Sequence, residues 1–158
     1  MEKIAKAIGL ALKVYLDSNV VMRLVFETDK DVEEIAKTSR EGKIDTFVSW
    51  LSLVEISRSL SRMADSQEAL ARINTKIEKD NIHVLFDFDP RLSSGSVGTS
   101  AVITGLEFSD HLHLLIASRN NLDYVVTYDR DLLSRLQFDS LKIVDPSEFV
   151  QQVLKAGK

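Results

Sequence analysis

The sequence contains no cysteine, and only two prolines and one tryptophan occur among its 158 residues. Without cysteine the chain has no disulfide framework, no thiolate zinc site and no cysteine nucleophile. Such a composition suits a reducing compartment, so we expect a cytoplasmic location. The length fits one domain, and a domain of this size buries roughly 68–70% of the surface of its unfolded chain, which is enough for a core without cross-links.

Long apolar runs are also missing. No stretch approaches the ~18 consecutive apolar residues that a membrane-spanning helix needs, so we expect no membrane span. Apolar side chains do occur within residues 1–13, but lysines interrupt them and no small-residue cleavage site follows. This segment therefore does not resemble a signal peptide.

Positive charge is not in excess, because 20 Lys and Arg residues face 24 Asp and Glu residues and give a net charge of −4. A chain without an electropositive field is usually a poor nucleic-acid binder. That argument fails where several acids gather around divalent ions, because the ions are then the largest local charges. Net charge alone therefore does not exclude a nucleic-acid substrate.

Several common catalytic motifs are absent. The sequence has no Gly-x-Gly-x-x-Gly and no Gly-x-x-x-x-Gly-Lys stretch, so dinucleotide and P-loop sites lack their phosphate-binding loops. It also has no Gly-x-Ser-x-Gly elbow, which excludes the usual serine hydrolase arrangement.

Short apolar runs that favour strands alternate with amphipathic segments that favour helices. We predict strands over 13–16, 44–48, 82–86, 124–127 and 142–144. We expect helices to begin near Asn19, Asp29, Ser49, Asp65, Ser109, Asp129 and Asp145. This alternation predicts an α/β fold, a three-layer α/β/α sandwich with a mostly parallel central sheet.

Two segments depart from this regular alternation. Residues 1–12 look helical and precede the first strand, and residues 87–107 are interrupted by Pro90 and by several glycines and serines. We therefore expect an N-terminal helical extension over 1–12 and a single domain over 13–158 with a long loop at about 87–107.

Four acids occupy apolar settings at the ends of predicted elements. Asp17 and Asp129 follow predicted strands, Asp110 opens a helix, and Glu55 lies about a turn and a half into its own. In α/β sheets ligands collect at the carboxyl ends of the strands. Carboxylates brought together beside a core usually face a cation, because desolvation and mutual repulsion otherwise cost free energy.

Oxygen-only ligands suit Mg²⁺ or Mn²⁺, which keep open positions for water and substrate phosphate. Such a cation can activate water and neutralise the charge that develops on a phosphodiester. The sequence therefore predicts a metal-dependent enzyme, with Asp17, Glu55, Asp110 and Asp129 as ligands.

Each acid also has a simpler explanation. Asp17 and Asp129 could cap the helices that follow them, and Asp110 could complement its helix dipole. Glu55 could pair with Arg58 three residues later. The four acids together make these explanations less favoured than metal ligation.

Other polar and aromatic residues carry weaker signals. His111 and His113 would point about 200° apart on a helix, which excludes shared zinc ligation, and we expect them on the helix surface or in packing contacts. We expect Trp50 in the core or an interface. Candidate phosphate contacts, although each alone is better explained as a solvated or paired side chain, are Arg23, Arg58, Arg119 and Arg130.

Four stretches in order resemble the PIN-domain nucleases, and within them the VapC-type toxin ribonucleases. The matching pieces are VYLDSNV at 14–20, LVE at 53–55, SDHLHLLIA at 109–117 and VVTYDRDL at 125–132. The resemblance covers residues 13 to about 150. Residues 1–12 and 87–107 depart from the compact family pattern.

This resemblance implies a Mg²⁺- or Mn²⁺-dependent endoribonuclease that leaves a 5′-phosphate and a 3′-hydroxyl. Asp17, Glu55, Asp110 and Asp129 match the acidic positions of the family. Residues matching supporting positions are Ser18, Asn19 and Thr127, with Asp131 as an auxiliary acid. Family members often form homodimers, and a small antitoxin silences the toxin subset.

Two alternatives remain open from the sequence. The chain could be a catalytically inactive PIN-like interaction module that docks through its long loop or its N-terminal helix. It could also be another Mg²⁺-dependent phosphotransfer enzyme, Toprim-like or a phosphatase, because Glu55 with Asp129-x-Asp131 loosely matches a Glu plus Asp-x-Asp arrangement.

Overall fold

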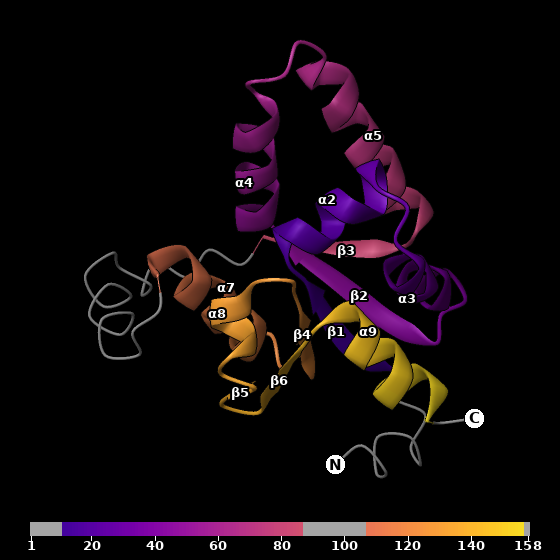
Figure 1. Cartoon of the computed structure of the whole chain (residues 1–158), viewed down its shortest axis with the longest axis vertical. Coiled ribbons are helices and arrows are strands. Elements are labelled where there is room, and N and C mark those ends of the chain that lie inside the picture. Colours follow the sequence, from indigo (N-terminus) through magenta and orange to yellow (C-terminus); the bar gives the residue numbers. More distant parts are fainter. Residues whose placement is uncertain (1–10, 87–106, 157–158) are drawn as a thin grey trace.

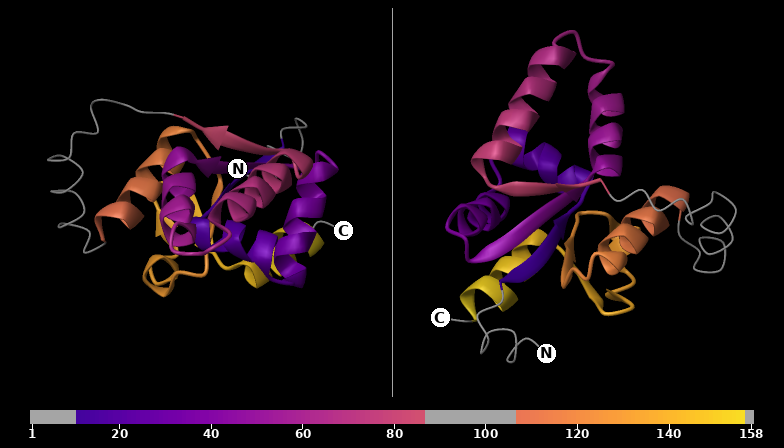
Figure 2. Two further views of the ribbon diagram at one scale, coloured as in Figure 1. Left: turned by 90° about the horizontal axis from the view of Figure 1, so that it is seen from above. Right: turned by 180° about the vertical axis from the view of Figure 1, so that it is seen from behind.

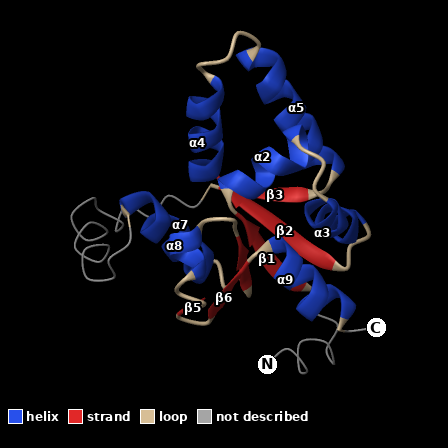
Figure 3. Cartoon of the chain, in the orientation of Figure 1, coloured by secondary structure: helices blue, strands red, loops and turns tan. Residues whose placement is uncertain are grey.

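The computed structural model describes residues 11–86 and 107–156. Within these ranges one six-stranded sheet runs in the order β3-β2-β1-β4-β6-β5. Its strands are β1 (Leu12–Leu16), β2 (Ile44–Ser49), β3 (Ile82–Leu85), β4 (Tyr124–Val126), β5 (Gln137–Phe138) and β6 (Leu141–Val144). All neighbouring pairs are parallel except β5 with β6. The mostly parallel sheet predicted from the sequence is confirmed, with β1 near its centre (Figure 3).

Helices cover both faces of the sheet, as expected for a three-layer sandwich. One face packs against α2 (Ser18–Phe26), α3 (Lys30–Arg40), α4 (Trp50–Leu60), α5 (Ser66–Lys79) and α9 (Pro146–Phe149), which continues as the π-helical segment η1 (Val150–Lys155). The other face packs against α7 (Phe108–Arg119) and α8 (Arg130–Leu133). Figure 2 shows these layers from two further directions.

Period-two alternation along β1 separates the two cores. Val14 and Leu16 belong to the core under α2 to α5, whereas Tyr15 belongs to the core under α7 and α8. This follows from strand geometry, in which successive side chains point to opposite faces. Tyr15 is fully buried, so its hydroxyl needs a partner inside the protein.

Helices α4 and α5 form a hairpin that rises beyond the edge of the sheet, with α2 between their bases (Figure 1). Helix α4 begins directly after β2, and the Ser49 hydroxyl caps it by accepting a hydrogen bond from the Ser52 amide at 3.2 Å. The first turns of α4 therefore stand at the carboxyl end of the sheet.

The sequence predicted most helix starts correctly. Carboxylates cap α2, α3, α8 and α9, and the capping residues are Asp17, Asp29, Asp129 and Asp145. Helix α3 has its C-cap at Glu41, and Gly42 directly after it takes the left-handed φ of 66° that often ends a helix.

The structure differs from the prediction at the starts of two helices and at one strand that was not predicted. Asp65 precedes α5 as expected, but its side chain makes no capping hydrogen bond. The N-cap of helix α7 lies two residues before the predicted cap at Ser109, because Glu107 takes the extended N-cap conformation and its carbonyl accepts from the His111 amide, which leaves Ser109 inside the first turn. Strand β5 has only two residues, too few for a periodic signal.

Parts of the predicted organisation lie outside the described residues. The expected helical extension over 1–12 lies outside them except for Ala11 and Leu12, and Leu12 already belongs to β1. The expected loop over 87–107 does so except for Glu107. Among the residues described, no helix is long and apolar enough to cross a membrane.

Candidate metal centre

Asp17 lies at the carboxyl end of β1, where two parallel strands meet. Its backbone amide donates a 3.1 Å hydrogen bond to the carbonyl of Val126, the last residue of β4. Its side chain is almost completely buried, with 5% exposure. A buried carboxylate needs compensating donors or a cation.

The Asp17 carboxylate accepts hydrogen bonds from a backbone amide and from neighbouring side chains. Oδ1 accepts from the Ser18 amide at 2.7 Å, and Oδ2 accepts from Asn19 Nδ2 at 2.9 Å and from the Thr127 hydroxyl at 2.7 Å. Asn19 is itself fixed, because its Oδ1 accepts from the backbone amide of Tyr128 at 3.1 Å. The residues matched to supporting positions, Ser18, Asn19 and Thr127, thus all contact this acid.

Glu55 reaches the same region from α4. Its Oε2 pairs with Nε2 of His113 on α7 at 3.0 Å. The sequence analysis had considered Arg58 as the partner of Glu55. Burial acts to raise the pKa of Glu55, but the hydrogen bond and charge of His113, helped by Ser18 and Arg58, lower the pKa below its ordinary value. Glu55 is therefore an ionised, half-buried carboxylate.

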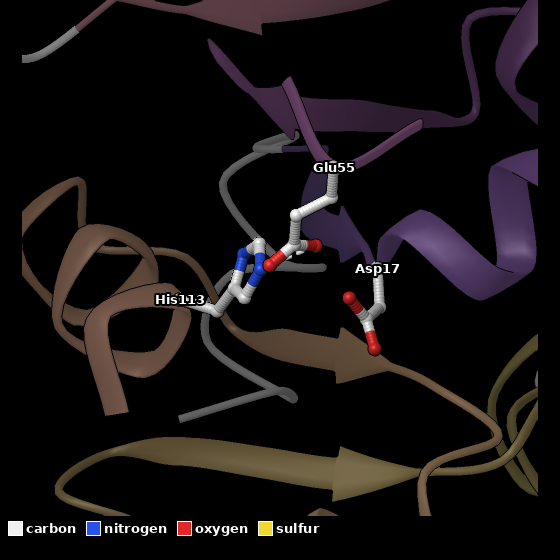
Figure 4. A group of neighbouring side chains, drawn as sticks. All are labelled: Asp17, Glu55 and His113. Atoms are coloured by element: carbon white, nitrogen blue, oxygen red, sulfur yellow. Dashed lines mark hydrogen bonds and ion pairs between the residues drawn. The ribbon is translucent and has the colours of Figure 1, made fainter. Parts of the chain in front are cut away.

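His113 is the functional residue that the sequence analysis left out of the site. Ligand atoms of Asp17, Glu55 and His113 all lie within 4.8 Å of one another, and Figure 4 shows the three side chains converging. The two histidines do point apart as expected, because His111 packs edge-on against Phe138. The available signal was the spacing of Asp110 and His113, which places both on one face of α7.

Asp110 and Asp129 complete the acidic surroundings without entering the tight group of three. Burial, together with the negative charges of Asp129 and Asp17, raises the pKa of Asp110 to about 6, while His113 opposes them. These carboxylates are thus close enough to repel one another. A perturbed acid among like charges is a frequent mark of a functional site.

Asp129 is both a helix cap and a neighbour of the site. Its Oδ1 accepts from the amides of Asp131 and Leu132 at 2.8 and 3.1 Å, as the capping explanation requires. Its own amide donates to the Thr127 hydroxyl at 2.9 Å, so Thr127 links it to Asp17. A cap uses one of two carboxylate oxygens and leaves the other for a ligand role. Asp131 is exposed on α8.

A cavity of about 350 Å³ adjoins the acids between α2 and α4. Its lining residues are Ser18, Asn19, Met22, Arg23, Glu27, Glu55, Ile56 and Ser59. The Arg23 guanidinium lies 4.0 Å above the Tyr128 ring and 3.7 Å from Asp29, whose carboxylate also accepts from the Tyr128 hydroxyl. These contacts hold Arg23 in the lining of the cavity.

The donor set fits a hard divalent cation. The four carboxylates come from four separate elements at the carboxyl end of the sheet, and they repel one another unless a cation or a proton intervenes. Neither a thiolate nor a pair of converging histidines is available among the described residues, which disfavours zinc. The arrangement fits Mg²⁺ or Mn²⁺ best.

A parallel α/β sheet with acids at its carboxyl edge defines a class of metal-site proteins rather than a single activity. Comparison of the sequence with family models narrows the class, because the model of the PIN domain matches residues 14–139. The chain belongs to the PIN-domain family, which confirms the resemblance noted from its four motifs. No curated protein sequence matches it.

Solved structures of similar fold come from several organisms. VapBC2 from Rickettsia felis bound to a DNA fragment from their promoter has a TM-score of 0.66 at 14% identity, covering 84% of this chain and 97% of that chain. DNA-bound VapBC from Salmonella typhimurium has a TM-score of 0.64 at 18% identity, covering 85% and 98%. PAE2754 from Pyrobaculum aerophilum has a TM-score of 0.63 at 19% identity, covering 92% of both chains. At these identities the likeness concerns the fold.

Proposed function

We propose that this protein is a metal-dependent endoribonuclease that hydrolyses RNA phosphodiester bonds with Mg²⁺ or Mn²⁺. The observation that carries the proposal is the convergence of Asp17 and Glu55 beside His113, with the pKa of Asp110 raised by burial, Asp129 and Asp17. Family membership supports nucleic-acid hydrolysis as the reaction. The resemblance to VapC-type toxins supports RNA as the substrate.

Asp17, Glu55, Asp110 and Asp129 would hold the cation. When bound, it would activate a water for attack on phosphorus and stabilise the leaving oxygen. The chain's own contribution is preorganisation: Asn19 and Thr127 hold Oδ2 of Asp17, and His113 holds Oε2 of Glu55. Before a cation binds, the raised pKa of Asp110 lets this carboxyl keep its proton to a higher pH than an ordinary aspartate does.

Cleavage of the RNA strand would leave a 5′-phosphate and a 3′-hydroxyl. The cavity beside Glu55 offers room for a nucleotide, and Arg23 in its lining supplies a cation for a phosphate. Tyr128 and Asp29 hold this guanidinium in place, so its contribution would be orientation as well as charge.

The test is cleavage of a 5′-labelled single-stranded RNA with Mg²⁺, Mn²⁺ or EDTA. We expect cleavage with either cation and none with EDTA. Asp17→Asn should reduce the rate more than about 100-fold, because losing a ligand should exceed the 10–100-fold typical of losing a supporting contact. Asp65→Asn removes the same charge from an exposed position without a side-chain cap and should leave the rate unchanged.

Each alternative has its own outcome in this experiment. Equal RNA cleavage by the parent and Asp17→Asn would show that the site is misassigned. Metal-dependent release of phosphate from a small phosphomonoester, without RNA cleavage, would favour the phosphatase alternative. Absence of both reactions, together with absence of Mn²⁺ binding, would favour the interaction module.

We also propose a homodimer and an antitoxin partner. The resemblance to VapC-type toxins supports both, and similar folds in proteins named VapBC support the antitoxin partner. Sedimentation should give twice the 17.8 kDa of one chain, and a mass of one chain at micromolar concentration would contradict the dimer. Inhibition of RNA cleavage by the product of an adjacent small reading frame would test the antitoxin.

A further inference from the structure

A buried chain of hydrogen bonds, here called the relay, runs through Ser49, Tyr15, His113 and Glu55. The Tyr15 hydroxyl lies 2.6 Å from Ser49 Oγ and 2.6 Å from Nδ1 of His113. Nε2 of His113 then lies 3.0 Å from Oε2 of Glu55. Ser52 adds a contact of 3.1 Å to the same hydroxyl. Ser49, Tyr15 and His113 are at most 2% exposed.

Glu55, the last group of the relay, fixes the position of one hydrogen on His113. An ionised carboxylate only accepts hydrogen bonds, so Nε2 of His113 carries the hydrogen that it shares with Glu55. In the neutral ring, Nδ1 accepts from the Tyr15 hydroxyl, and in the imidazolium, Nδ1 donates to it. Nε2 is protonated in both cases.

The imidazole therefore has no lone pair for a cation. Nε2 cannot donate to Glu55 and coordinate a metal at the same time, and Nδ1 faces the Tyr15 hydroxyl in the core. Proximity alone would make His113 a third ligand beside Asp17 and Glu55. The hydrogen bonds assign it a different role.

The relay also connects the elements that deliver the acids. Ser49 caps the helix that carries Glu55. Tyr15 lies in β1, two residues before Asp17. His113 follows Asp110 by about one turn in α7. Fully satisfied buried polar networks favour one arrangement of the elements that they join. Loss of the central hydroxyl should therefore loosen the geometry of the acids.

We propose that His113 is a positioning residue, which Tyr15 orients so that its Nε2–H holds one oxygen of Glu55 and leaves the other for the cation. This inference rests on the proposed function, because it concerns the same metal site. Partners that hydrogen-bond to metal-binding carboxylates and histidines commonly contribute 10–100-fold in metal affinity or activity. We expect an effect of that size from the relay.

The decisive experiment is NMR of the ¹⁵N-histidine-labelled protein, titrated with Mg²⁺. A positioning role requires that Nε2 of His113 keeps its hydrogen in the Mg²⁺-saturated protein. Loss of this hydrogen on Mg²⁺ binding would make His113 a ligand and overturn the inference while leaving the proposed function intact. Absence of Mg²⁺ binding by the parent would overturn both.

Variants test the relay without relying on cleavage. Tyr15→Phe removes only the central hydroxyl and should weaken Mn²⁺ binding at least about 10-fold in calorimetry. Tyr124→Phe removes a hydroxyl from a second buried tyrosine, which contacts Lys142 outside the relay, and should not change Mn²⁺ affinity. Equal affinity in Tyr15→Phe and the parent would contradict the inference.

Replacements of His113 distinguish positioning from simple packing. Gln retains an N–H that can reach Glu55, whereas Leu fills space but donates nothing. We expect His113→Gln to bind Mn²⁺ more tightly than His113→Leu. The reverse order, or parental affinity in His113→Leu, would overturn the inference. Tyr15→Phe provides the same test if the leucine variant does not fold.

Discussion

The hydroxyl of Thr127 donates a 2.7 Å hydrogen bond to Oδ2 of Asp17, a residue 110 positions earlier in the chain. The same oxygen of Thr127 accepts from the amide of Asp129 at 2.9 Å. One buried hydroxyl thus joins the acids that follow β1 and β4. The two acids are far apart in sequence but follow strands that are parallel neighbours and end at the same edge of the sheet.

Thr127→Val should test this link. Valine keeps the shape of threonine but leaves the Asp129 amide without its partner and removes a donor from Asp17. We expect a loss of about 1–3 kcal/mol in the free energy of unfolding and a 10–100-fold loss in Mn²⁺ affinity. Urea unfolding and calorimetry measure the two effects.

The control for this substitution is Thr75→Val on the exposed side of α5. It should change neither quantity by more than experimental error. Parental Mn²⁺ affinity in Thr127→Val would mean that the hydroxyl does not hold Asp17 in a binding geometry.

The raised pKa of Asp110 predicts how the metal-free protein depends on pH. Its pKa of about 6 lies above the ordinary aspartate value of about 3.9, so ionisation is costlier in the folded protein. The penalty is absent below pH ~4, grows between pH ~4 and ~6, and is complete above ~6. Stability contributed by this group therefore falls as pH rises through that window.

Asp110→Asn should abolish that part of the pH dependence. Without metal, the variant should be more stable than the parent at pH 7 by about 1–2 kcal/mol, after allowance for solvent screening of a half-buried group. At pH 4 the two proteins should be nearly equal. Urea unfolding in EDTA at both pH values measures this, and a variant less stable than the parent at pH 7 would contradict the assigned repulsion.

Cation binding should stabilise the folded protein. At a Mn²⁺ concentration 100 times Kd, mass action adds about 2.7 kcal/mol, which should raise Tm by roughly 5–10 °C for a domain of this size. Glu55→Gln should lose most of this shift because it removes a ligand. Glu78→Gln, at an exposed position on α5, should retain it, and equal shifts in both variants would exclude Glu55 as a ligand.

Local signals in the sequence were sufficient for much of the fold and for the places of Asp17 and Asp129 in it. Asp17 and Asp129 follow apolar runs and precede helices, a pattern that predicts both strand ends and caps. Those two carboxylates lie where the pattern placed them, and each also caps its helix. The parallel sheet follows from the alternation of such runs.

His113 could not be assigned in the same way. Its role depends on the Tyr15 hydroxyl, 98 residues away, and on Glu55, 58 residues away. Sequence periodicity shows which face of α7 the histidine occupies but not which groups meet that face. Strand β5 was missed for a different reason, since its two residues follow Leu136, whose positive φ has no glycine or asparagine to signal it.

The most direct test of the central claim is a crystal structure of the protein with Mn²⁺, using anomalous scattering to locate the ion. We expect a peak between the carboxylates of Asp17 and Glu55, with Asp110 or Asp129 bound directly or through water, and with Nε2 of His113 still facing Glu55. A Mn²⁺ peak elsewhere, with none at these acids, would contradict the proposed metal site.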